Sequence, residues 1–234
     1  MPVLSTKKDR CFSLRLPVLD DVFLCFETGD SVVLYGDATS FMLFVLCVRC
    51  ELPFDKGGLD SPVVFVDGGN SFNPYLVAEI GRSYGMDSRT VLEKIYVSRA
   101  FTAYQLSSLI LEELDKILNS KRARLLIVSD ITSLFFDKDL PKTEAKDLFV
   151  KICTKLSKVA AKKRTIAVTN YFPSRKSKQG LFFEAVLFGW SNILIKLERK
   201  RSVLTLILED HPRIKPFSID FPESCNPLSA FMET

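Results

Sequence analysis

One stretch near the start of the chain has the layout of a phosphate-binding loop without the residues that bind phosphate. The apolar run Val32–Tyr35 predicts a buried strand, Gly36 opens a turn, and an apolar helix follows from about Phe41. Gly36 stands where the first glycine of the G-x-x-x-x-G-K-[ST] motif stands. Counting on from it, the second glycine position holds Phe41, the lysine position Met42 and the hydroxyl position Leu43. The stretch is either not a phosphate loop or one that has lost its chemistry.

A second stretch, which begins at Tyr171, combines positive charges with aromatic rings. Arg175, Lys176 and Lys178 follow Tyr171 and Phe172 without an intervening acidic residue. Phosphate contacts from cations, together with bases stacked on aromatic rings, hold single-stranded nucleic acid without sequence preference. The sequence therefore predicts a DNA-binding segment here. The alternative is a solvated loop whose aromatic residues belong to the core on either side.

Two further basic runs would widen such a face if they lay beside it. One contains Lys121, Arg122 and Arg124, and the other is Arg199-Lys200-Arg201. Runs of this kind are also typical of ordinary solvated turns.

The sequence gives little evidence for a metal site or for a catalytic histidine. Cys47 and Cys50 form a single C-x-x-C pair inside an apolar helix, and a zinc site needs further ligands at suitable spacing. Buried thiols are the expected state. His211 is the only histidine and precedes a proline, with no serine or cysteine partner pattern nearby, so we expect no catalytic role for it.

Composition is that of a globular domain. The 234 residues are 47% hydrophobic and 26% charged, with a formal net charge of +4, which permits a nucleic-acid partner without requiring one. The longest apolar run, Phe41–Val48, is far shorter than the ~18 residues of a membrane span, and no secretory signal is visible. Six cysteines lack the spacing of a disulfide framework. These features favour a cytoplasmic location.

Apolar strands alternate with amphipathic helices, which predicts an α/β fold with a largely parallel sheet covered on both faces. A change of pattern after residue 180 predicts an antiparallel hairpin. We expect one core domain over residues 14–222, a short arm over 1–13 and a tail over 223–234. The predicted strands cover residues 32–35, 63–66, 94–97, 125–128, 165–169, 193–197 and 203–208, and the predicted helices 74–84, 103–118 and 143–163.

Five motifs in order resemble the ATPase core of the RecA-like recombinases, specifically the branch of archaeal RadA and the eukaryotic-type recombinases. They are Glu27-Thr28-Gly29, Asp67–Phe72 with Pro74, Tyr96–Thr102, Leu125–Asp130 and Val168–Asn170. The resemblance covers nearly the whole chain. It implies a RecA-like core, a mostly parallel central sheet flanked by helices with an antiparallel C-terminal hairpin extension. It also places Arg99 among the DNA-binding residues, whereas the plainer interpretation of Arg99 is a structural hydrogen-bond donor.

The departures from that family concern the residues that its members use to hydrolyse ATP. The position of its general-base glutamate holds Gly69, and its Walker B aspartate position holds Ser129, with Asp130 displaced by one. In a strand, a shift of one residue points a side chain to the opposite face, although the end of a strand can relax this. The family glutamine that links nucleotide to DNA is replaced by Tyr171.

Together with the altered phosphate loop, these departures predict loss of ATP hydrolysis. What remains of a nucleotide site is Gly36, Ser40 and Asp130. No cofactor, metal or catalytic residue is predicted.

Three functions follow from this pattern. The first is a non-catalytic recombinase paralogue that binds DNA, most naturally single-stranded, and assists recombination or repair. The second is a structural subunit of a paralogue complex that acts through protein contacts alone. The third is an ATPase with a non-standard site around Asp67, Asn70 and Asp130. The expected partners are DNA and a RadA-type recombinase or another paralogue. Self-assembly into filaments is not expected, because no Phe-x-x-Ala linker occurs before the core.

Overall fold

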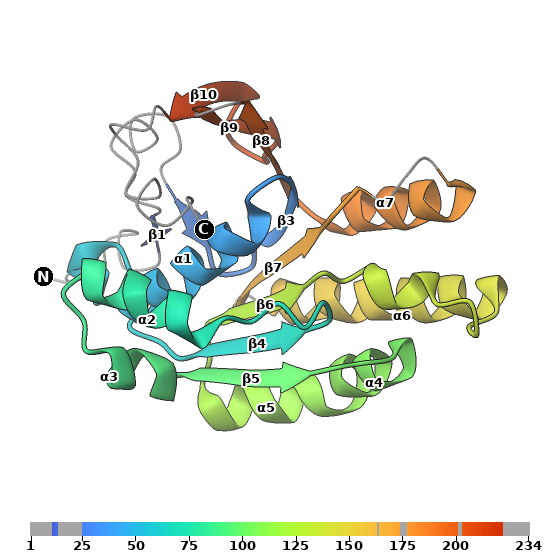
Figure 1. The fold of residues 1–234 in the computed structure, drawn as a ribbon, viewed down its shortest axis with the longest axis horizontal. Coiled ribbons are helices and arrows are strands. Elements are labelled where there is room, and N and C mark those ends of the chain that lie inside the picture. The colour runs from blue at the N-terminus through green and yellow to red at the C-terminus, as the bar shows by residue number, and fades with distance from the viewer. Residues whose placement is uncertain (1–10, 14–24, 163, 174–176, 201–202, 222–234) are drawn as a thin grey trace, which may run out of the picture.

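The structure is a computed structural model that describes residues 11–13, 25–162, 164–173, 177–200 and 203–221. Its centre is an eight-stranded sheet in the order β10-β9-β8-β3-β7-β6-β4-β5. The strands from β8 to β5 are parallel, and β9 and β10 extend them in antiparallel fashion, as predicted (Figure 1). The strands of this sheet are β3 (Ser31–Gly36), β4 (Val63–Asp67), β5 (Ile95–Arg99), β6 (Leu125–Ser129), β7 (Ile166–Tyr171), β8 (Ile193–Lys200), β9 (Val203–Asp210) and β10 (Phe217–Phe221).

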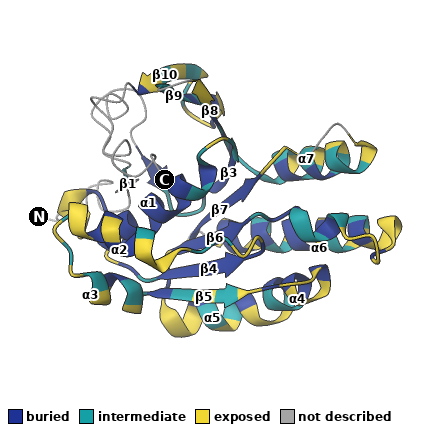
Figure 2. Cartoon of the chain, in the orientation of Figure 1, coloured by how far each residue is buried: buried dark blue, intermediate teal, exposed yellow. Residues whose placement is uncertain are grey.

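Helices cover both faces of the parallel strands. The helices α1 (Thr39–Glu51), α2 (Pro74–Ser83) and α3 (Ser88–Glu93) pack on one face. The helices α4 (Ala103–Ser108), α5 (Leu114–Lys121), α6 (Lys142–Ala161) and α7 (Lys178–Trp190) pack on the other. Side chains alternate along a strand, so successive residues pack on opposite faces of the sheet. Val32 packs in the hydrophobic core under α1 to α3, and Val33 packs in the core under α4 to α7. The central strands β4, β6 and β7 are therefore buried on both faces, as their continuous apolar runs predict, whereas the outer strand β5 is partly exposed (Figure 2).

Part of the predicted N-terminal arm belongs to the fold. Residues of β1 (Cys11–Phe12) pair antiparallel with β2 (Phe26–Glu27), and Phe12 is fully buried. Cys25, next to β2, is disulfide-bonded, which the cysteine spacing did not predict. The first ten residues of the arm and the whole predicted tail lie outside the described residues.

Several elements differ from the predictions, among them the helix α3, which was not predicted. The predicted helix 103–118 runs on to Lys121 and contains a π-helical segment, Leu109–Glu113, between α4 and α5. β10 was not predicted. The helix α7 was also missed, because residues 181–188 are apolar except for Glu184 and so show no helical alternation. Ser177 caps this helix by accepting a hydrogen bond from the Gly180 amide (2.9 Å).

In the described part of the chain, no helix is both long and apolar enough to cross a membrane.

The last turn of α1 buries two charged residues. Arg49 is 2% exposed, and its guanidinium donates to the carbonyls of Ser13 (2.8 Å) and Lys56 (3.2 Å). Glu51 is 3% exposed, and neither of its carboxyl oxygens has a hydrogen-bond partner among the described residues. Burial raises the pKa of Glu51 to about 8, although the charge of Lys94 opposes this effect. Glu51 is therefore mainly protonated at neutral pH.

This buried acid predicts a pH-dependent stability. The unfolded chain releases the proton near the ordinary pKa of 4.5, whereas the folded chain holds it until about pH 8. The folded state binds more protons between these values, so the free energy of unfolding falls as the pH rises through this window. Glu51→Gln removes the dependence and is expected to raise the free energy of unfolding at the upper end by on the order of 2 kcal/mol. Urea unfolding across the window measures this, with Glu79→Gln on the exposed side of α2 as control. Equal pH slopes for Glu51→Gln and wild type would contradict the prediction.

Candidate functional site

The polar residues singled out in the sequence gather where the parallel strands end. Asp67 of β4 pairs in register with Arg99 of β5 and with Ser129 of β6. In open α/β sheets, ligands bind outside the carboxyl ends of the strands. The arrowheads of β4 and β5 mark this carboxyl edge in Figure 1.

The turn between β3 and α1 is short and closed. Only Asp37 and Ala38 separate Gly36 from the first helical residue, Thr39. The Asp37 amide donates to the Leu197 carbonyl of β8 (2.8 Å), and the Arg199 amide donates to the Asp37 carboxylate (3.0 Å). A Cβ atom on Gly36 would lie 2.2 Å from the Leu197 carbonyl oxygen, so only glycine allows this approach.

This turn corrects the count made from the sequence. A complete phosphate loop places more residues between its first glycine and its lysine than this turn contains. Because α1 begins early, Met42 and Leu43 lie within the helix and are buried in the core. The residues that open the helix, where the motif has its lysine and hydroxyl, are Thr39 and the half-buried Ser40.

Asp67 is the centre of a hydrogen-bond network. Its carboxylate is fully buried and accepts from the amides of Ser71 and Phe72 (3.0 Å each) and from the Ser129 hydroxyl (2.9 Å). The Arg99 guanidinium forms an ion pair with it (3.4 Å) and donates to the Phe72 carbonyl (3.3 Å). Arg99 is thus a hydrogen-bond donor within the fold, and because 43% of its side chain is exposed, its contact with DNA stays a prediction.

Asp130 lies against Gly69. β6 ends at Ser129, and Asp130 then takes a left-handed conformation (φ 46°), so the strand no longer fixes which way it points. A Cβ atom on Gly69 would lie 2.8 Å from the Asp130 Cβ and 3.0 Å from its Oδ2. The Asp130 side chain therefore fills the space that a side chain at position 69 would need. Burial raises the pKa of Asp130, and the negative charge of Asp67 adds to this.

Asn170 connects three elements at the same edge. Its side chain is 1% exposed, accepts from the Asp130 amide (2.8 Å) and donates to the Thr39 hydroxyl (3.0 Å). Its carbonyl accepts from the Ile131 amide (3.2 Å). The sequence placed Asn170 in a motif without giving it a task, and a polar residue at the end of an apolar strand was the available signal.

The predicted DNA-binding residues divide into three groups. Tyr171 is 3% exposed; its ring stacks on Tyr35, and its hydroxyl donates to Glu184 (3.0 Å). Phe172 is 45% exposed, and Lys178 is exposed as the first residue of α7. Arg175 and Lys176 lie outside the described residues. Phe172 and Lys178 therefore face solvent beside the carboxyl edge, whereas Tyr171 faces the core.

The two additional basic runs lie at opposite edges of the sheet. Arg199 and Lys200 end β8, which is parallel to β3, so they share the carboxyl edge with Phe172. Lys121, Arg122 and Arg124 directly precede β6 and lie at the amino edge. Only the run that contains Arg199 and Lys200 can extend the surface around Phe172.

Metal-binding geometry is absent from the described part of the chain, where no three His, Cys, Asp or Glu side chains gather. Cys47 and Cys50 are free and buried, as predicted, and burial raises the pKa of both thiols. His211 Nδ1 accepts from the amides of Arg213 and Ile214 (3.1 Å each), and burial lowers the pKa of His211.

The contact between Gly69 and Asp130 predicts that side chains at these positions exclude each other. Gly69→Ala is expected to lower the free energy of unfolding by about 1–3 kcal/mol through overpacking. Asp130→Gly removes the obstructing side chain, so Gly69→Ala should cost little in that background. Urea unfolding of the four proteins gives the coupling energy.

A matched control is Gly189→Ala, because a Cβ atom there meets nothing within 4 Å. Its effect should be the same with or without Asp130→Gly. Additive effects of Gly69→Ala and Asp130→Gly would show that the steric explanation is wrong.

Comparisons with known proteins assign the chain to a family. Residues 22–186 match the model of the Rad51 family. The chain is 33% identical over 112 residues to DNA repair protein RAD51 homolog 1 of Arabidopsis thaliana, which covers 47% of this chain and 32% of that protein. It is 32% identical over 113 residues to DNA repair protein RAD51 of Mycosarcoma maydis, which covers 47% and 33%. The match thus spans about a third of the length of these relatives. With more than half of its residues inside the family model, the chain belongs to the Rad51 family.

Proposed function

We propose that the chain is a non-catalytic member of the Rad51 family that binds single-stranded DNA and assists recombination or DNA repair. The observation that carries this proposal is a contrast at one edge of the sheet. The turn after β3 is closed, whereas the segment after the neighbouring strand β7 presents an aromatic ring and a lysine to solvent. Tyr35 pairs with Tyr171 in register, so the turn and the segment leave the sheet side by side.

The closed turn supports the loss of ATP chemistry. Phosphate loops use backbone amides that point at the phosphates, a lysine and a magnesium-binding hydroxyl. Here the Asp37 amide is already bonded to Leu197, and the Thr39 hydroxyl accepts from Asn170. No lysine occurs from Gly36 to the end of α1. Asp130 occupies the space next to Gly69, where the family has its general base.

The segment after β7 supports DNA binding. Phe172 offers a ring for base stacking, and Lys178 offers a phosphate contact, with Arg175 and Lys176 between them in the sequence. Arg199, at the end of β8, stands at the same edge and would extend the positive surface. The family relatives named DNA repair proteins give the biological context, and a RadA-type recombinase or another paralogue is the proposed partner.

Replacing the segment should weaken single-strand binding. The triple change Arg175→Ala, Lys176→Ala, Lys178→Ala is expected to reduce affinity for a labelled oligonucleotide. It should also flatten the dependence of log K on log salt by about 0.7 for each phosphate that the protein no longer neutralises. Phe172→Ala removes stacking and should cost about 1–3 kcal/mol of binding free energy with little change in that slope. Fluorescence anisotropy at several salt concentrations separates the two effects.

The control for this experiment replaces three exposed lysines elsewhere, Lys116, Lys151 and Lys215, with alanine. Its loss of affinity should be much smaller. No binding of single-stranded DNA by the wild type at low salt would refute the DNA part of the proposal.

Nucleotide chemistry is tested separately. Calorimetric titration with Mg-ATP is expected to give no binding heat, and the protein with single-stranded DNA should release no phosphate. Ser40→Ala and Asp130→Asn should leave both results unchanged. Phosphate release that either substitution abolishes would instead favour an ATPase with a non-standard site.

A further inference from the structure

A row of cations lies at the amino edge of the sheet, on the far side from the segment after β7. Its members are Lys94, Lys121, Arg122, Arg124 and Arg164, here named the amino-edge row. All but the half-buried Lys94 are exposed. In the sequence, part of this row looked like an extension of the DNA-binding face, and the fold places it on a separate surface.

The sheet fixes the spacing of this row. Lys94 directly precedes β5, Arg124 directly precedes β6, and Arg164 comes shortly before β7. The starts of these strands are in register through Val63 of β4. Neighbouring strands lie about 4.8 Å apart, so the row extends over about 14 Å from β5 to β7. Duplex DNA carries a phosphate every ~3.4 Å along each strand, so the row can face several phosphates at once.

Backbone hydrogen bonds hold the row in place. The Val63 amide donates to the Lys94 carbonyl (3.0 Å), and the Ile166 amide donates to the Arg124 carbonyl (2.8 Å). The Arg124 amide in turn donates to the Ser61 hydroxyl (2.9 Å). Positions anchored in this way present charge without the loss of backbone entropy that a loop would incur on binding.

Two of these cations already cover aromatic rings. The Lys121 ammonium lies 4.0 Å from the centre of the Tyr96 ring, and the Arg124 guanidinium lies 5.3 Å from that of Phe54. Each ring thereby has one face occupied by a cation. The surface is consequently better suited to phosphate contact than to base stacking, which distinguishes it from the segment after β7.

Nearby acids neutralise little of this charge. None of the five cations has an ion pair with a described carboxylate. Glu93 forms an ion pair with Arg89, and Asp115 forms ion pairs with Lys155 and Lys162. Asp55 and Asp60 are exposed in the loop before β4.

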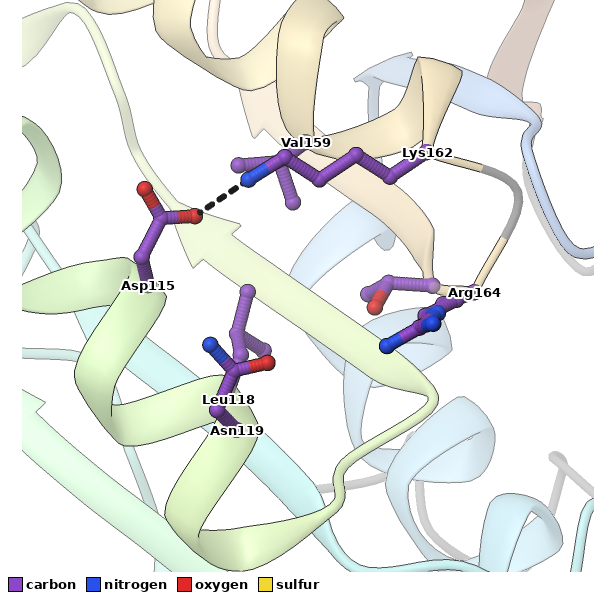
Figure 3. Close-up of a pocket in the computed structure, with 7 residues that line it drawn as sticks. Asp115, Leu118, Asn119, Val159, Lys162 and Arg164 are labelled. Carbon is purple, nitrogen blue, oxygen red and sulfur yellow. Dashed lines mark hydrogen bonds and ion pairs between the residues drawn. The ribbon is translucent and has the colours of Figure 1, made fainter.

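A pocket of about 400 Å³ lies at the β7 end of the row. It lies between the C-terminal ends of α5 and α6, and Figure 3 shows Lys162 directed at Asp115 with Arg164 standing apart from that pair. It is lined by Asp115, Leu118, Asn119, Val159, Lys162, Arg164 and Thr165. Arg164 therefore belongs both to the amino-edge row and to the lining of this pocket.

We propose that the amino-edge row binds the phosphate backbone of double-stranded DNA. A duplex hides its bases and displays a dense line of phosphates, which matches a surface of fixed cations with covered rings. The row and the segment after β7 lie at opposite edges of the sheet, so one molecule can hold a duplex and a single strand simultaneously.

The test compares two charge-reversed proteins with the wild type. The row variant is Arg122→Glu, Arg124→Glu, Arg164→Glu, and the control is Lys142→Glu, Lys151→Glu, Lys215→Glu, with the same change of net charge. Anisotropy titrations use a labelled duplex of about 20 base pairs and an oligo-dT strand of the same length. Thermal unfolding checks that each protein is folded, and the milder set Arg122→Gln, Arg124→Gln, Arg164→Gln replaces the row variant if that protein is not.

The row variant is expected to bind the duplex at least tenfold more weakly, with a salt slope shallower by about 0.9 for each phosphate that it no longer neutralises. It should keep its binding of oligo-dT. Equal losses of affinity in the row variant and the control, or no duplex binding by the wild type at low salt, would overturn the proposal. Displacement of the duplex by poly-glutamate as readily as by unlabelled duplex would also overturn it, because the row would then be a site for acidic protein segments. A wild type that binds the duplex but not oligo-dT would refute the proposed function while leaving this inference in place.

Discussion

A carboxylate removed from water needs donors on every side, and Asp67 imposes this requirement on the carboxyl edge of the sheet. Two amides of the following turn, the Ser129 hydroxyl and the Arg99 guanidinium meet it. Because these donors come from three neighbouring strands, the charge fixes how the ends of β4, β5 and β6 lie together. Breaking a buried pair costs more than forming it gains, so such a network is kept as a unit.

This constraint limits which polar groups at the carboxyl edge remain available to a ligand. The donors around Asp67 serve the fold, and Asn170 joins β6 and β7 to the start of α1 in the same way. These polar groups therefore bond one another. Phe41 and Met42, which the count from Gly36 aligned with the motif's glycine and lysine, lie within α1 and are buried in the core. Among the described residues, Phe172 and Lys178 after β7 and four of the five cations at the amino edge are exposed to solvent.

The sequence was sufficient for the parallel sheet, because Val63–Val66 and Leu125–Val128 are apolar throughout and lie between amphipathic helices. It also placed Asp67, Ser129 and Asn170 at strand ends. It could not show that Tyr171 faces inward, since that depends on Tyr35, which is distant in sequence, and on Glu184 of a helix that was not predicted. The start of α1 was misplaced for a related reason, because the turn is shortened by its contact with Leu197, a residue of a strand near the other end of the chain. Helix α7 carried no periodic signal at all.

The packing of Asp130 on Gly69 has a consequence for how this sequence can change with time. A glutamate introduced at position 69 would meet the space that the Asp130 side chain fills, so it first requires a smaller residue at position 130. The two positions can therefore change at low cost only in that order.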